Sequence, residues 1–165
     1  MSGCKNHELG IEAKTVIENA SEKVAAFLGS TPHEIVFTSG GSESNNTVIK
    51  GVAHTYKNKG SHMITSNIEH PAIINPCKYL ESIGYKISYV PVDQYGMVNP
   101  ADVESVMTDR TVLVTIMHSN NETGTIQPIE EISKICRAHH VLLHTDASQS
   151  VGKVPIDVNE HRARS

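Results

Sequence analysis

The sequence has no hydrophobic run long enough to cross a lipid bilayer. The longest run, Val112 to Met117, has the length of a strand and is interrupted by Thr115, whereas a membrane-spanning helix needs about 20 apolar residues. Residues 1–10 are polar and lack the apolar stretch of a secretory signal. These absences predict a soluble intracellular protein, cytoplasmic and with no membrane partner.

The sequence also lacks the features of several binding classes. With 14 basic and 18 acidic residues it has no basic excess to attract nucleic acid. Its three cysteines, Cys4, Cys77 and Cys136, form no CxxC pair, which suits a reducing compartment. The only adjacent histidines, His139 and His140, lack the i, i+4 spacing of a helical zinc site. We expect neither a nucleic-acid partner nor a bound metal.

What the sequence does contain is an alternation of helical and strand patterns. Apolar residues recur every three or four positions over residues 11–28, and Gly29 follows as a stop signal, which predicts an amphipathic helix. Short β-branched runs then predict strands near residues 35–38, 62–66, 86–92, 111–117 and 141–145. Helix starts are indicated at Pro71, Pro100 and Pro128. The pattern predicts one α/β domain whose mostly parallel sheet is flanked by helices.

Unusual residues follow the first two predicted strands. Residues 38–45 form a small-residue loop that opens a helix, and glycine beside a helix N-terminus lets a phosphate approach free N–H groups. A tight turn with Ser42 as helix cap is the alternative. Neither the P-loop nor the dinucleotide glycine pattern is present. His70 ends the next loop, where its ring could move protons or stack on a planar ligand, or simply begin a helix.

Two further loops follow the later strands. Residues 118–124 contain adjacent amides and Thr-Gly, which are common in turns, so Asn121 has no assignment from this pattern alone. Asp146 follows the apolar residues 141–143. A carboxylate at that place is costly unless a cation or several donors stabilise it, and a capping role is the alternative. In open α/β sheets such strand ends form the ligand crevice.

Together these segments resemble the class V pyridoxal-phosphate enzymes, and among them the cysteine desulfurases and selenocysteine lyases. The resemblance spans His7 to about Asp157, and its most specific carriers are residues 37–45, Glu69-His70, residues 118–124 and residues 144–153. It implies part of the large domain of a fold type I transferase over residues 1–165, without the small C-terminal domain. The implied cofactor is pyridoxal 5′-phosphate.

The resemblance also implies a role for each candidate site residue. Gly41 and Ser42 would bind the cofactor phosphate, with Ser42 where the family usually has threonine. His70 would stack on the ring and help to move protons, as the catalytic residue of this set. The remaining cofactor-binding residues would be Asn121 near the ring hydroxyl and substrate carboxylate, Asp146 at the ring nitrogen, and Gln149 at the ring hydroxyl. An opposite charge near that nitrogen favours its protonated form and makes the ring a better electron sink.

Other family features are not found in these residues. The lysine that holds the cofactor covalently would follow the next strand, and residues 159–165 depart from the family pattern there. Lys153 does not match that lysine. Cys4, Cys77 and Cys136 do not match the sulfur-accepting cysteine, so we interpret them as packing or surface residues. We therefore expect a chain truncated at both ends, unstable in isolation, with an unpaired sheet edge, and inactive. If the start is shortened, an organelle is an alternative location.

For the lineage, the resemblance implies removal of sulfur or selenium from L-cysteine or L-selenocysteine, leaving alanine, in iron–sulfur cluster or selenium supply. Expected partners are the small-molecule substrate, a second copy in the family homodimer, and a sulfur-accepting scaffold protein. Two alternatives remain. One is a class V aminotransferase, although those relatives generally stack an aromatic residue where this chain has His70. The other is a non-catalytic product that pairs with full-length subunits.

Overall fold

The protein is described here by a computed structural model over residues 8–158. The chain divides into two compact units. Among the described residues, the first contains residues 8–37 and 156–158, and the second contains residues 38–155. We describe each unit separately. Cys4 and the ending 159–165 lie outside the described residues.

The first unit is built around the helix that the apolar periodicity predicts. Helix α1 spans Glu8–Leu28 and is followed by the short 3-10 helix η1, Pro32–Glu34. Gly29 ends α1 with φ +70°, a left-handed conformation that glycine adopts without steric cost. The backbone N–H of Val158 donates to the carbonyl of Leu28 at 3.0 Å. The predicted helix and its stop signal are therefore confirmed.

The strand expected at residues 35–38 is wrong. Ile35 has extended dihedral angles, φ −91° and ψ 124°, but residues 35–38 pair with no described strand. Val36 and Phe37 are 78% and 55% exposed. A β-branched run favours an extended backbone, but a strand also requires a neighbouring ladder to accept and donate its hydrogen bonds.

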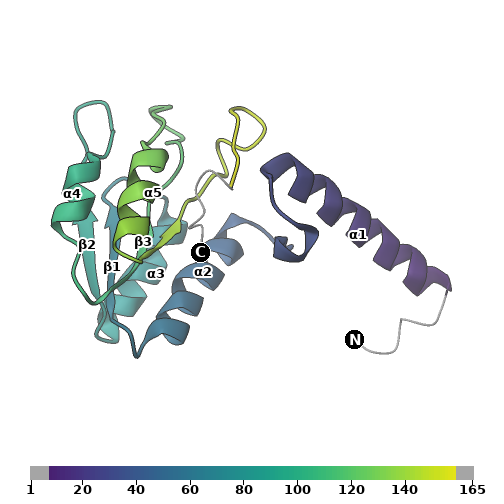
Figure 1. Cartoon of the computed structure of the whole chain (residues 1–165), viewed down its shortest axis with the longest axis horizontal. Helices are drawn as coiled ribbons and strands as arrows, with labels where there is room; N and C mark the ends of the chain where they lie inside the picture. Colours follow the sequence, from purple (N-terminus) through teal and green to yellow (C-terminus); the bar gives the residue numbers. More distant parts are fainter. Residues whose placement is uncertain (1–7, 159–165) are drawn as a thin grey trace. The chain divides into compact units, whose positions relative to one another are not determined.

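The second unit contains a four-stranded parallel sheet in the order β2-β1-β3-β4 (Figure 1). The strands are β1 (His62–Ser66), β2 (Lys86–Val90), β3 (Thr111–Thr115) and β4 (Leu142–His144). The α-helices are α2 (Gly41–Tyr56), α3 (Pro71–Ser82), α4 (Pro100–Ser105) and α5 (Ile129–Ala138). All three strand pairs are parallel. The predicted α/β class, the parallel sheet and four of the five strands are confirmed.

Two predicted strands are too long by two residues at their carboxyl ends. Strand β2 ends at Val90 rather than at Val92, because Pro91 has no N–H to continue the ladder. Strand β3 ends at Thr115 rather than at Met117. The earlier end of β3 leaves Met117 in the loop that follows the strand.

Proline marks the helix starts as expected. His70 and Asn99 are the N-cap residues of α3 and α4, and each accepts a hydrogen bond from a backbone N–H two residues later, at 3.1 Å in both cases. Pro128 is the N-cap residue of α5, one position before the helix begins. The side-chain acceptors satisfy amides that have no partner within the helix.

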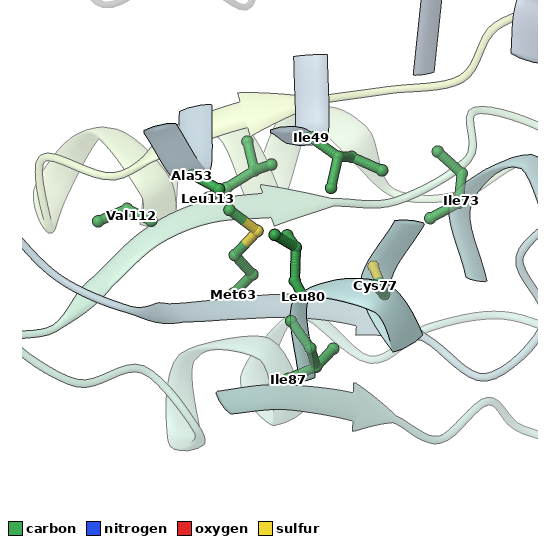
Figure 2. Close-up of a cluster of buried hydrophobic side chains, with 9 residues drawn as sticks. All are labelled: Ile49, Ala53, Met63, Ile73, Cys77, Leu80, Ile87, Val112 and Leu113. Atoms are coloured by element: carbon green, nitrogen blue, oxygen red, sulfur yellow. The ribbon is translucent and has the colours of Figure 1, made fainter. Parts of the chain in front are cut away.

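Helices cover both faces of the sheet (Figure 1). On one face, α2 and α3 pack against the strands; Figure 2 shows this cluster of Ile49, Ala53, Met63, Ile73, Cys77, Leu80, Ile87, Val112 and Leu113. On the other face, α4 and α5 pack against Ile64, Val90 and Val114. Two covered faces explain why β1 and β3 are buried along their whole length.

The two described cysteines belong to these cores. Cys77 is 0% exposed and Cys136 is 1% exposed, and both are free thiols. Burial raises the pKa of each thiol to about 12, so neither is a reactive thiolate near neutrality. The packing interpretation is confirmed for both.

Among the described residues, no helix combines the length and apolar character that a membrane crossing requires.

Candidate functional site

A pocket of about 290 Å³ lies in the second unit, where strands β1, β3 and β4 end and helix α2 begins. All six of the site residues expected from the sequence line it. The lining residues are Gly41, Ser42, Asn45, His70, Ala72, Met117, Ser119, Asn121, Asp146, Ser148 and Gln149. The topology explains this gathering, because the carboxyl ends of parallel strands open onto one edge of the sheet.

The start of α2 supplies the anion-attracting side of the pocket. Gly40 is the N-cap residue and has no side chain to cap the first turn, so free backbone N–H groups and the positive end of the helix dipole remain. A Cβ on Gly41 would lie 3.2 Å from Ser148 Oγ, so glycine allows this close approach. Ser42 is the second residue of the helix rather than its cap, which corrects the capping alternative.

His70 combines both interpretations offered by the sequence. Its Nδ1 accepts a hydrogen bond from the Ala72 backbone N–H at 3.1 Å, so the residue caps α3. The ring is also exposed and lines the pocket. Because Nδ1 acts as the acceptor, the neutral ring carries its proton on Nε2. A neutral His70 is therefore able to donate from that atom.

Asp146 is the anionic side chain of the pocket. Its Oδ2 accepts from Asn45 Nδ2 at 2.8 Å and its Oδ1 accepts from the Ser148 backbone N–H at 3.0 Å. Partial burial by itself raises the pKa of Asp146, but the hydrogen bonds from Ser148 and Asn45, together with nearby His144, outweigh it and lower that pKa. Several donors thus stabilise this carboxylate, as the sequence argument required.

Asn121 and Gln149 are exposed residues of the pocket rim. The neighbour of Asn121, the buried Asn120, makes the turn itself: its Oδ1 accepts from the backbone N–H groups of Glu122 and Thr123 at 2.8 and 3.0 Å. The turn therefore does not occupy the Asn121 side chain. Gln149 Oε1 accepts from Lys153 Nζ at 3.3 Å.

A second carboxyl group lies just behind the pocket. Glu69 is 7% exposed, and burial raises its pKa to about 7. Hydrogen bonds from the Ser66 hydroxyl and the Met117 backbone N–H lower that pKa, while the charge of Asp146 raises it. Near neutrality Glu69 is therefore only partly ionised, whereas Asp146, whose pKa is lowered, is ionised in the pocket lining.

Sequence reasoning did not single out five of the lining residues: Asn45, Ala72, Met117, Ser119 and Ser148. Two of them had a recognisable signal. Asn45 is a polar residue one turn into a helix that follows a glycine loop, and Ser148 stands two residues after an aspartate, the spacing of an Asx turn. The others are visible only once the strand ends are placed together.

The chain belongs to the aminotransferase class-V family, whose model matches residues 2–163. Within this class it is similar to cysteine desulfurases. It is 50% identical to cysteine desulfurase IscS of Dictyoglomus turgidum, over 93% of this chain and 39% of that protein. It is 49% identical to the probable mitochondrial cysteine desulfurase of Dictyostelium discoideum, over 94% of this chain and 35% of that protein.

Solved structures give the same result. The structure described as SspA in complex with cysteine matches with a TM-score of 0.91 and 42% identity, over 98% of this chain and 47% of that one. The chain therefore spans less than half the length of each of these relatives. Class-V aminotransferases and cysteine desulfurases use pyridoxal phosphate, and these relatives include bacterial and mitochondrial proteins.

Proposed function

We propose that this chain is part of a pyridoxal-phosphate-dependent cysteine desulfurase and that residues 38–155 contribute the cradle for the cofactor. One observation carries the proposal: the start of α2 at Gly41 and Ser42 lines the same pocket as Asp146. The start of α2 attracts an anion, and the Asp146 carboxylate attracts a cation. Pyridoxal phosphate has both, a phosphate group and a ring nitrogen that can be protonated. Residues 1–165 would form part of the large, cofactor-binding domain of that enzyme.

The residues present fit this cofactor. A Cβ at position 41 would lie 3.2 Å from the Ser148 hydroxyl oxygen, so Gly41 keeps this part of the pocket open. The Ser42 and Ser148 hydroxyls add donors at the pocket wall. At about 290 Å³ the pocket is close to the lower end of the range for small-molecule sites, about 300–1,000 Å³. These features support a phosphorylated aromatic ligand as the occupant of the pocket.

Each of these side chains then has a physical task. When bound, pyridoxal phosphate supplies an electron sink for the electron pair released at the substrate α-carbon. Asp146, held ionised by Asn45 and Ser148, would keep the ring nitrogen protonated. His70 would face the ring and hold a transferable proton on Nε2. From the rim, Gln149 would hydrogen-bond the ring hydroxyl, and Asn121 would lie near that hydroxyl and the substrate carboxylate.

The proposed reaction removes sulfur from L-cysteine and leaves alanine. Similarity to two proteins named cysteine desulfurase and to a structure solved with cysteine favours this substrate. Selenocysteine is the alternative substrate. A class V aminotransferase is a second candidate function, and His70 in place of an aromatic ring disfavours it. A homodimer and a sulfur-accepting scaffold protein are the proposed partners. The free, buried thiols of Cys77 and Cys136 suit a reducing location, in the cytoplasm or in an organelle.

Cofactor titration tests the proposal. We expect the purified 165-residue chain to bind pyridoxal phosphate more tightly than pyridoxal, because only the former has the phosphate. The substitution Asp146→Asn should weaken binding roughly tenfold, since one pKa unit of lost charge stabilisation corresponds to about that factor. Asp109→Asn is the matched control, because Asp109 is exposed and precedes β3 at the other end of the sheet. Fluorescence or absorbance titration gives both affinities.

Two outcomes would count against the proposal. Equal affinity for pyridoxal and pyridoxal phosphate would contradict the assignment of the phosphate-binding site. Unchanged affinity in Asp146→Asn would contradict the role proposed for that carboxylate.

Borohydride reduction followed by peptide mass mapping tests whether a lysine of this chain holds the cofactor. We expect no single stoichiometric adduct, because Lys153 does not match the family's cofactor lysine; one adduct at one lysine would contradict that expectation.

A further inference from the structure

Glu69 is a buried carboxyl group beside the pocket that the proposed chemistry does not use. It immediately precedes His70 and is 7% exposed. Its Oε1 accepts two hydrogen bonds, from the Ser66 hydroxyl at 2.7 Å and from the Met117 backbone N–H at 2.9 Å. Within residues 8–158 it has no ion-pair partner. A buried carboxyl group without a cation needs another explanation, because its burial is costly.

The sheet register shows which hydrogen bond Glu69 replaces. The N–H groups of Ile116 and His118 donate toward the β4 side, to the carbonyls of His144 and Asp146 at 3.1 and 2.9 Å. Because hydrogen-bonding direction alternates along a strand, the N–H of Met117 between them points toward β1. Strand β1, however, ends at Ser66.

The regular ladder between β1 and β3 stops before it reaches Met117. Thr65 is aligned with Thr115, so an extended β1 would place Asn67 opposite Met117. In a continued parallel ladder the Met117 N–H would donate to the Ser66 carbonyl, but the ladder between β1 and β3 stops at the pair Thr65 and Thr115. Without that bond the buried Met117 amide would lack an acceptor, which is costly in a buried site. Glu69 Oε1 fills that place.

We propose that Glu69 is a positioning residue: its Oε1 stands in for the β1 backbone acceptor, and so fixes the spacing across the crevice between the His70 loop and the Met117–Asn121 loop. The two strands can then separate to form a pocket without leaving an unpaired amide. The benefit for cofactor binding rests on the proposed function. The link from Glu69 to Met117 does not.

The test compares two substitutions at this position. Glu69→Gln keeps a carbonyl oxygen as acceptor at the same reach, whereas Glu69→Ala removes it. In Glu69→Ala we expect amide hydrogen exchange at Met117, measured by NMR, to accelerate more than tenfold, and pyridoxal phosphate to bind roughly tenfold more weakly. In Glu69→Gln both should stay within about threefold of the wild type. Val103→Ala serves as the control for simple destabilisation, because Val103 is fully buried in the other core.

The outcomes separate the two proposals. Slow exchange at Met117 in Glu69→Ala would overturn the positioning role, as would a Glu69→Gln variant that behaves like Glu69→Ala. Equal weakening of cofactor binding by Val103→Ala would reduce Glu69 to a general stability effect and overturn the role too. If the wild type binds no pyridoxal phosphate, the proposed function fails, while exchange at Met117 still decides whether Glu69 secures that amide.

Discussion

Replacing Glu69 with glutamine should change how stability depends on pH. Burial raises the pKa of Glu69 from 4.5 to about 7 in the folded protein, so the native state holds a proton that the unfolded chain releases near its ordinary pKa. The stabilisation from this protonated group is complete below pH 4.5 and is lost as pH rises through about 7. Glutamine is neutral at every pH and has no such loss.

The magnitude follows from the two pKa values. A difference of about 2.5 units between 4.5 and about 7 corresponds to about 3 kcal/mol at about 1.4 kcal/mol per unit. A domain's total stability is only about 5–15 kcal/mol, so this change is large enough to measure. The other titratable groups that interact with Glu69 do not change protonation state between pH 4.5 and about 7. The pKa of Asp146 is lowered, and the pKa of Cys77 is about 12.

Urea denaturation followed by circular dichroism, at intervals from pH 4.5 to pH 8, measures the effect. The wild type should lose up to about 3 kcal/mol relative to Glu69→Gln across this range. Glu122→Gln is the matched control, because Glu122 is exposed in the loop beside the pocket, and its curve should follow that of the wild type. Parallel curves for the wild type and Glu69→Gln would refute the reasoning, because they would mean that Glu69 is already ionised in the folded protein.

Two further substitutions test other buried polar groups. Asn45→Ala should destabilise the folded protein by about 1–3 kcal/mol in urea denaturation, because it removes the 2.8 Å donor to a half-buried Asp146 carboxylate; a change below about 0.5 kcal/mol would show that water replaces the donor. For His62, burial lowers the pKa, and Lys86 lowers it further. Stability should therefore fall as pH drops below 6.5, and His62→Gln should reduce that fall; an NMR titration of the His62 ring at or above pH 6.5 would contradict the assignment.

Much of the fold could be predicted because its signals are local. Strand β1 occupies residues 62–66 as expected, and α3 begins at the proline that follows His70. In each case, a few adjacent residues determine the backbone conformation. The prediction of a strand at residues 35–38 was wrong because strand pairing is not a local property. Val36 is β-branched, as is typical of strand residues, but it has no partner among the described strands.

The same distinction applies to the pocket. The sequence placed Asp146 at a strand end and required donors for it, but it could not identify Asn45, which lies 101 positions away along the chain. Likewise, the sequence marks Glu69 only as the neighbour of His70 in a family motif. Its role depends on where β1 leaves the sheet relative to Met117, and that relation exists only in the folded register.

The charges of the pocket depend on this arrangement as a whole. Asn45 and Ser148 keep Asp146 ionised, while burial keeps Glu69 largely neutral up to about pH 7. The site therefore presents one negative charge in the same pocket as the positive end of α2, which suits a ligand with one anionic and one cationic end. Above about pH 7 a second negative charge would develop behind Asp146. It would favour a cationic ring nitrogen further but would oppose a phosphate, so the balance between the two ends should shift with the protonation of Glu69.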